Sequence, residues 1–197
     1  KHGWYYHYKY ETEKLESLAH HGLSEVKDFL LKVKDTRPDH LFTKGPRSSQ
    51  VDVDHRLTVQ SVKHRVSLLA RVGLESQYYD NAHMNVQMFM LGYDNETVAM
   101  EVPIWMEASE YSNYEEVFGT KEALTGHIDI LRLESGDIWI WDYKPNAHRE
   151  KRASIQVSLY ALMLSVRTGI PLKHIRCGYF DDVHAYEVNP LPLLIES

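Results

Sequence analysis

The chain has 197 residues, of which 43 % are apolar, and it carries a formal net charge of −6, values typical of one globular domain with its own core. The negative charge disfavours proteins that coat nucleic acid over most of their surface, since these are usually basic. The single cysteine, Cys177, excludes a disulfide within the chain and a cluster held by four cysteines. No apolar run reaches the about 18 residues of a membrane span, and we expect a cytoplasmic protein.

The N-terminal part, residues 1–80, is predicted to be mainly helical. Apolar residues recur at about helical spacing over residues 11–34, although Gly22 in the middle favours two shorter helices. A second helix is predicted over residues 52–72. We expect this part to belong to the same domain as the rest of the chain, so that one domain spans residues 1–197.

Residues 84–188 show the apolar alternation and the turn signals of a β-sheet. One helix is predicted over residues 148–168 and ends at Gly169. This order of elements predicts an α/β (or α+β) fold, with a central mixed β-sheet flanked by helices. The predicted strands cover residues 84–92, 97–106, 124–133, 138–144, 174–180 and 183–188.

The hairpin over residues 124–144 places two acids and a lysine among apolar residues. Side chains of a strand alternate between its faces, so Asp142 and Lys144 share one face. With Ser135-Gly136 as the turn, Asp129 lies opposite Asp142, with Cβ atoms about 4.5–5.5 Å apart. Two carboxylates at that distance repel each other, and a divalent cation between them would reverse this effect. In the opposing interpretation, the three charges lie past the rim of the core, in water.

The helix that follows the hairpin also carries a polar pair. Gln156 and Tyr160 are four residues apart and therefore share one face of the helix. Such a polar stripe is either part of a site or simply the solvent face of the helix. Oxygen ligands favour Mg²⁺ or Mn²⁺, and two carboxylates with a lysine around such a metal suit hydrolysis of a phosphodiester.

These residues together resemble the PD-(D/E)XK nuclease superfamily, in particular its RecB-like branch. The pattern of that branch is a Gly-x-x-Asp strand, an Asp/Glu-x-Lys strand and a helix with Gln-x-x-x-Tyr. The corresponding residues here are Gly126-His-Ile-Asp129, Asp142-Tyr-Lys144 and Gln156-Val-Ser-Leu-Tyr160. The resemblance implies a restriction-endonuclease-like core, without the iron–sulfur cluster that some members hold with four cysteines.

The resemblance also implies roles for the site residues. Asp129 and Asp142 would bind the metal, with the backbone carbonyl of Tyr143 as a further ligand. Lys144 would position or activate the attacking water, and the glutamine and tyrosine of the helix would support the site and the DNA. Glu101 matches an acidic position on the preceding strand, where it would approach the metal or orient the lysine, unless it is only a charge at the sheet edge.

Members of the RecB-like branch place a histidine on a helix before the sheet, often as another metal ligand. We choose His64 for this role, because it lies within the helix predicted before the first strands. His55 and His83 are rival candidates. His20 and His21 lie earlier in the chain and fit less well.

The leading hypothesis is a Mg²⁺- or Mn²⁺-dependent deoxyribonuclease, expected to be an exonuclease of DNA repair, recombination or defence. Its expected partners are single- or double-stranded DNA, together with a helicase or an upstream domain. The alternative is a non-catalytic nucleic-acid-binding or scaffold domain of the same fold. A zinc hydrolase is disfavoured, because no His-x-x-x-His or His-Glu-x-x-His pair occurs. The stretch Asn146-Ala-His148-Arg149 has no role that the sequence assigns.

Overall fold

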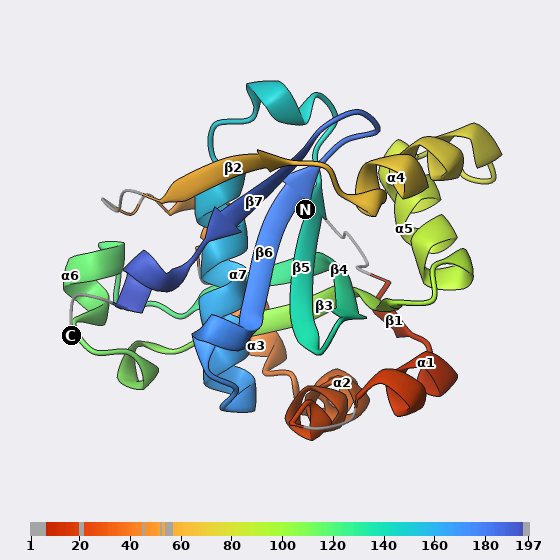
Figure 1. Cartoon of the computed structure of the whole chain (residues 1–197). Coiled ribbons are helices and arrows are strands. Elements are labelled where there is room, and N and C mark those ends of the chain that lie inside the picture. The colour runs from red at the N-terminus through yellow and green to blue at the C-terminus, as the bar shows by residue number, and fades with distance from the viewer. Residues whose placement is uncertain (1–6, 20–21, 45, 52, 54–56, 195–197) are drawn as a thin grey trace.

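One seven-stranded sheet organises the chain, with the strand order β1-β3-β4-β5-β6-β7-β2. The computed structural model describes residues 7–19, 22–44, 46–51, 53 and 57–194 (Figure 1). The strands are β1 (Lys9–Tyr10), β2 (Thr58–Val62), β3 (Thr97–Met106), β4 (Leu124–Glu134), β5 (Asp137–Tyr143), β6 (Ile175–Phe180) and β7 (Ala185–Asn189). The helices are α1 (Thr12–Leu18), α2 (Ser24–Thr36), α3 (Asp39–Lys44), α4 (Arg65–Ser76), α5 (Ala82–Tyr93), α6 (Tyr114–Phe118) and α7 (Ala153–Thr168).

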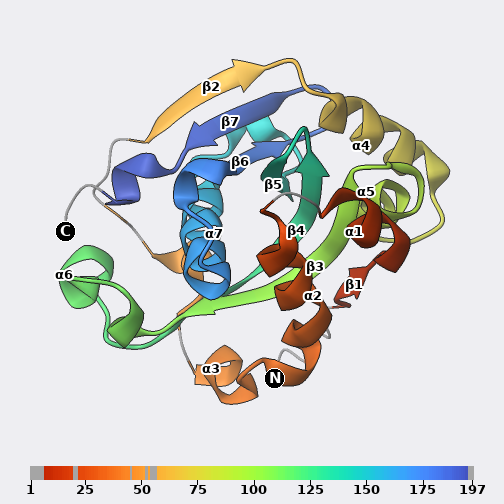
Figure 2. The same ribbon diagram turned by 60° about the horizontal axis from the view of Figure 1, so that its bottom comes forward.

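The sheet is mixed, as the sequence predicts. β5 and β6 run parallel and are joined through α7, whereas the other paired strands run antiparallel. Figure 2 shows the sheet curving around α7. The fold is therefore an α/β fold consistent with a restriction-endonuclease-like core. Within the described residues, no helix has both the length and the apolar character needed to cross a bilayer.

The two faces of β5 belong to two different apolar cores. Ile138 and Ile140 pack in the core that contains most of the buried side chains of α7. Trp139, Trp141 and Tyr143 pack in the second core, with buried residues of α4 and α5. The side chains of β5 thus alternate as predicted, and helices cover both faces of this strand.

The β4–β5 hairpin has the register that the sequence predicts. Leu133 pairs with Ile138 and Leu131 with Ile140. Ser135 and Gly136 form the turn with φ angles of 55° and 85°, and such positive values match the right-handed twist of the flanking strands. The ladder ends where Ile130 faces Trp141. Asp129 and Asp142 come one position later, where the two strands separate.

The prediction of one helix over residues 52–72 is wrong. Thr58–Val62 is instead β2, which pairs along its whole length with β7 at the edge of the sheet, and α4 begins only at Arg65. The β-branched residues of Thr-Val-Gln-Ser-Val favour a strand once a partner strand is available. The N-terminal part, predicted to be mainly helical, therefore also contributes two strands, β1 and β2.

The strand predicted over residues 84–92 is also wrong, because this segment is the helix α5. The Asn81 side chain begins the helix by accepting hydrogen bonds from the backbone N–H groups of His83 and Met84. A short, nearly continuous apolar run fits a buried strand and a buried helix equally well. Val86, Met90 and Leu91 are buried, so the packing of the helix selects between these two structures.

Residues 11–34 form two helices, α1 and α2, separated near Gly22, whose φ angle is +96°, as the glycine favours. Two other segments differ from the sequence prediction in a smaller way. The helix predicted over residues 148–168 starts later, at Ala153, and is preceded by a short 3-10 helix at Ala147–Arg149. Residues 107–122, predicted as a loop, contain the short helix α6.

Candidate active site

Asp129 is fixed at the point where β4 and β5 separate. Its Oδ2 atom accepts a hydrogen bond from the backbone N–H of Tyr143, at 3.1 Å. The same oxygen lies 2.6 Å from Nε2 of His83 on α5. The carboxylate thus takes the place of a β4 backbone carbonyl as acceptor for Tyr143, which on its other side pairs with Phe180 of β6.

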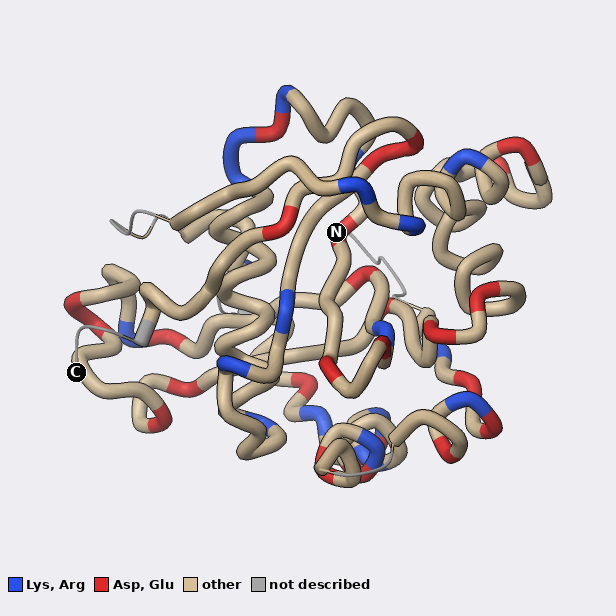
Figure 3. Tube along the Cα trace, in the orientation of Figure 1, with Lys and Arg blue, Asp and Glu red and all other residues tan. Residues whose placement is uncertain are grey.

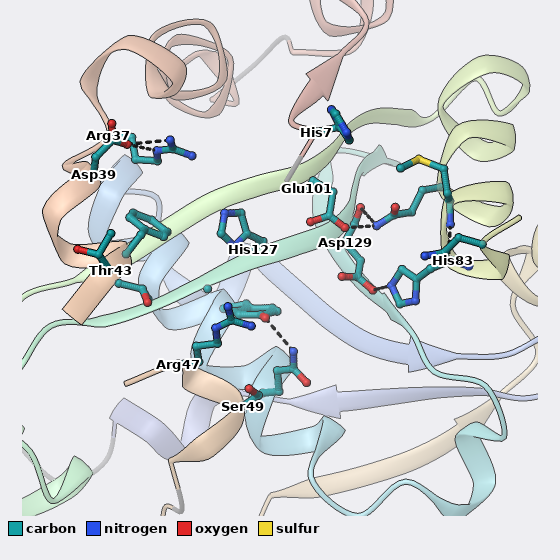
Figure 4. A pocket seen from close by; sticks show the side chains of 18 residues that line it. His7, Arg37, Asp39, Thr43, Arg47, Ser49, His83, Glu101, His127 and Asp129 are labelled. Carbon is teal, nitrogen blue, oxygen red and sulfur yellow. Dashed lines mark hydrogen bonds and ion pairs between the residues drawn. The ribbon is translucent and has the colours of Figure 1, made fainter. Parts of the chain in front are cut away.

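α5 presents two polar side chains to the acids of the sheet. His83 and Gln87 are four residues apart and so share one helix face. The Gln87 side-chain amide donates to Oε1 of Glu101 at 2.6 Å and to the backbone carbonyl of Asp129 at 3.3 Å. Figure 4 shows His83 pointing at Asp129. The helix thus holds one acid from each of two neighbouring strands.

Glu101 adopts a backbone conformation that is unusual inside a strand. Its φ angle is +51°, which costs about 1–3 kcal/mol in a residue other than glycine and tends to occur at functional sites. Met100 faces Ile130 and Val102 faces Ile128, so Glu101 lies across from Asp129. The Oε2 atom of Glu101 is buried and has no hydrogen-bond partner within the described residues. Burial and the nearby Asp129 raise the pKa of Glu101 to about 7, against the effect of Gln87 and His83.

Asp142 and Lys144 form a close pair on the same face of the chain. Oδ2 of Asp142 lies 2.6 Å from Nζ of Lys144, and Asp142 is only 1 % exposed. Its Oδ1 atom has no hydrogen-bond partner in the described part of the chain. Burial and Asp129 raise the pKa of Asp142 to about 7, although Lys144 opposes this. Burial would lower the pKa of Lys144, but Asp142 outweighs it and holds the amine in its charged form.

The charge of Asp129 depends on the cations that touch it. Burial would raise the pKa of Asp129, but His83 outweighs that effect, assisted by Lys144 and the Tyr143 N–H, and keeps the carboxyl ionised. Burial likewise opposes the charge of His83, yet Asp129 raises the pKa of the imidazole to about 9. The cluster therefore contains one ionised acid, Asp129, and two acids, Glu101 and Asp142. The negative charge of Asp129 disfavours the ionisation of both.

These residues fit a divalent metal ion. His83, Glu101 and Asp129 each offer a ligand atom, and the three atoms lie within 4.8 Å of one another. The buried, unpartnered oxygens of Glu101 and Asp142 are costly without a partner, and a cation would supply one. A donor set dominated by carboxylate oxygens favours Mg²⁺ or Mn²⁺ over softer metals.

The predicted Gln156–Tyr160 pair on α7 lies against Gly126, the glycine of the β4 motif. The Gln156 side-chain amide donates to the Tyr160 hydroxyl at 2.8 Å. A Cβ atom at Gly126 would overlap the Tyr160 ring and lie 2.9 Å from Oγ of Ser48. Only glycine therefore leaves room for the tyrosine against the strand. Burial, together with Asp142, raises the pKa of Tyr160 well above its usual range, so the phenol keeps its proton.

A pocket of about 880 Å³ connects the acids to a group of cationic and aromatic side chains. In Figure 4, Glu101, Asp129 and His83 lie at one end, Arg37 lies at the other, and His127 lies between them. Phe42 lines the pocket beside His127, with ring centroids 5.4 Å apart. Gln156 and Tyr160 contribute to its wall. At the far end, Arg37 forms an ion pair with Asp39 at 2.7 Å, and Arg47 also lines the pocket. A cavity that joins the acidic cluster to two arginines can hold a metal and a phosphate-bearing ligand together.

The structure does not bring His64 to this site. His64 caps α4 by accepting a hydrogen bond from the Val66 N–H at 3.3 Å, its ring packs on Trp141, and its Nε2 atom lies 3.3 Å from Glu134. Glu134 is five residues beyond Asp129 on β4, a separation of about 16 Å along a strand. His83, the rival candidate, reaches Asp129 instead. His20, His21 and His55 lie outside the described residues.

Sequence reasoning missed Gln87 altogether and ranked His83 too low. Both errors come from the prediction of a strand over residues 84–92, in which side chains four residues apart are well separated along the chain. The signal that could have found the pair is Asn81, a strong helix N-cap residue directly before Ala82 and His83. A helix starting there places the two polar side chains on one face.

Comparison with known families gives one match. The model of the PD-(D/E)XK nuclease superfamily matches residues 4–188. No curated protein and no solved structure matches the chain significantly. The matched span includes the Gly126–Asp129 strand, the Asp142–Lys144 strand and the Gln156–Tyr160 helix face.

The contact between Gly126 and Tyr160 gives a test of the site's packing. Gly126→Ala should lower the free energy of unfolding by about 1–3 kcal/mol, the usual cost of overpacking. The cost should be smaller in a Tyr160→Leu background, because the ring that the new methyl group meets is gone. Urea unfolding of the two single variants and the double variant measures both effects.

Gly92→Ala is the matched control, since Gly92 lies in α5 with open space around it. There alanine should leave stability unchanged or raise it by about 0.5–1 kcal/mol. Equal effects of alanine at Gly126 and Gly92 would contradict the described packing.

Proposed function

We propose that this chain, which belongs to the PD-(D/E)XK nuclease superfamily, is a Mg²⁺- or Mn²⁺-dependent deoxyribonuclease of the RecB-like branch. Membership of the superfamily implies a nuclease-type function that uses a divalent metal. One observation carries the finer proposal. Asp129, held by His83 and by the Tyr143 N–H, lies beside Glu101 and Asp142, which each have a buried oxygen without a hydrogen-bond partner in the described chain.

In this proposal Glu101, Asp129, Asp142 and the Tyr143 carbonyl are the oxygen ligands, and His83 takes the place first given to His64. When bound, the metal polarises the phosphate and lowers the pKa of a coordinated water. The residues of the chain hold the acids in position. Gln87 orients Glu101 through its hydrogen bond, and the N–H of Tyr143 orients Asp129.

Lys144 is the proposed electrostatic catalyst. Its ammonium group remains charged, because Asp142 holds it by an ion pair at 2.6 Å. A fixed cation beside the acids stabilises negative charge that develops on a phosphate in the transition state. Gln156 and Tyr160, hydrogen-bonded to each other, form a supporting wall of uncharged hydrogen-bonding groups.

The pocket favours a DNA end as the substrate. Its volume of about 880 Å³ lies in the range of about 300–1,000 Å³ that holds small ligands and single nucleotides. Phe42 and Arg37, which is ion-paired with Asp39, line the part of the pocket away from Glu101 and Asp129, where a guanidinium can contact a phosphate and a ring can stack on a base. We therefore propose an exonuclease of DNA repair, recombination or defence, acting with a helicase or an upstream domain.

Purified protein should degrade end-labelled linear DNA with Mg²⁺ or Mn²⁺ and lose that activity in EDTA. Covalently closed circular DNA should be spared, because it offers no end to the pocket. Lys144→Ala should reduce turnover by about 100-fold or more, the scale for one electrostatic donor. The control is Lys151→Ala, an exposed lysine of the following loop, which should cost far less.

Activity without divalent metal, or no cleavage of any nucleic acid with Mn²⁺, would contradict the nuclease proposal. Cleavage of circular and linear DNA at equal rates would contradict only the exonuclease part. Circular dichroism of each variant excludes loss of fold as the cause.

The two histidines give a separate prediction about metal affinity. His83→Ala should raise the metal concentration for half-maximal activity by about 10–100-fold, and excess metal should partly restore the rate. His64→Ala removes a helix cap, so it should lower stability and leave the metal requirement unchanged. Titration of Mn²⁺ against activity measures both. The opposite result, with only His64→Ala changing the metal requirement, would return the ligand role to His64.

A further inference from the structure

We propose that His148, Asp181 and His184 form a second metal site, suited to Zn²⁺ or another imidazole-binding transition metal and separate from the acidic cluster. Each residue offers one ligand atom, and the three atoms lie within 4.8 Å of one another. His148 belongs to the Asn146–Arg149 stretch that the sequence analysis leaves without a role. The other two residues belong to the turn between β6 and β7.

The distances are close to those of a tetrahedral zinc site. With ligand bonds of about 2.0–2.2 Å, neighbouring ligand atoms of such a site are about 3.3 Å apart. Nδ1 of His184 lies 3.2 Å from Oδ1 and 3.4 Å from Oδ2 of Asp181. The rings of His148 and His184 have centroids 5.1 Å apart. His148 is exposed, so a rotation of its side chain can close the remaining gap.

Asp181 is held in place by the backbone around it. Its Oδ1 atom accepts hydrogen bonds from the N–H groups of Val183 and His184, at 2.8 and 2.6 Å. Its Oδ2 atom accepts one from the N–H of Ala147, at 2.8 Å. Metal-binding carboxylates are characteristically oriented by such additional hydrogen bonds. These hydrogen bonds alone would explain a metal-free turn. They do not explain why the imidazole of His148 lies beside that of His184.

The ligand chemistry separates this site from the acidic cluster. Two imidazoles and one carboxylate suit Zn²⁺ and its neighbours, whereas an oxygen-rich set suits Mg²⁺ or Mn²⁺. Three protein ligands leave one position for water or an exchangeable ligand. The proposal uses none of the residues assigned to phosphodiester cleavage and stands whether or not the chain is a nuclease.

The position of the site suggests what the metal would do. The backbone N–H of Lys144 donates to the carbonyl of Phe180 at 2.9 Å, and Asp181 follows directly. A metal here would tie the loop after β5 to the β6–β7 turn. Figure 3 shows Lys and Arg on that loop, which carries Arg149, Lys151 and Arg152. The metal would therefore fix the basic segment that leads from Lys144 to α7.

The test uses Zn²⁺ and Co²⁺ with the whole chain in an Asp129→Asn background, which disables the acidic cluster. We expect one Zn²⁺ per chain by competition with a chromophoric chelator, and visible Co²⁺ absorption of a tetrahedral site. Adding His148→Ala or His184→Ala should weaken Zn²⁺ binding by about 10–100-fold or more and abolish the absorption. His174→Ala, which removes an exposed histidine outside the cluster, should change neither.

Two results would overturn the proposal. One is Zn²⁺ binding that is unaffected by His148→Ala and His184→Ala. The other is the absence of stoichiometric Zn²⁺ and of the Co²⁺ absorption in the Asp129→Asn protein, which would mean that the turn is only a hydrogen-bonded structure. Because His148 is exposed, its alanine variant is expected to fold, and circular dichroism confirms this.

Discussion

Asp129 is buried between two other carboxyl groups, and the surrounding structure compensates for that crowding. Burial and, after it, the charge of Asp129 raise the pKa of Glu101 and the pKa of Asp142 to about 7. His83 and Lys144 supply positive charge, at 2.6 Å from Asp129 and from Asp142 respectively. A divalent cation would provide ligands for the unpartnered oxygens and offset the repulsion together.

Several irregular features of the fold follow from this arrangement. β4 and β5 separate beyond Ile130 and Trp141, and the Asp129 carboxylate takes the Tyr143 N–H. Glu101 adopts a positive φ within β3. α5 lies where its His83–Gln87 face meets both acids. In contrast, His64 lies among the aromatic side chains and ion pairs at the far end of β4.

Regular features were predictable from the sequence, and those set by tertiary contacts were not. The register of the β4–β5 hairpin followed from the period of two and the Ser135-Gly136 turn. α7 followed from its apolar content and Gly169. α5 did not, because its short apolar run fits a strand or a helix, and this error hid His83 and Gln87. The φ angle of Glu101 and the approach of His148 to the β6–β7 turn depend on distant contacts, which no local pattern records.

The central claim is that the buried acids repel one another and that a divalent metal converts this repulsion into binding. Its most direct test is a set of thermal melting curves for the wild type and Asp142→Asn, each with and without Mn²⁺, with the exposed Asp80→Asn as the control. Metal at about 100 times its dissociation constant stabilises the folded protein by about 2.7 kcal/mol, and about 1 kcal/mol moves Tm by 2–4 °C in a chain of this size.

The account predicts that Mn²⁺ raises Tm of the wild type and of Asp80→Asn by several degrees. Asp142→Asn should melt at or above the wild type without metal and respond little to it. A metal-free Asp142→Asn protein that is clearly less stable, and that responds to Mn²⁺ as the wild type does, would contradict the claim.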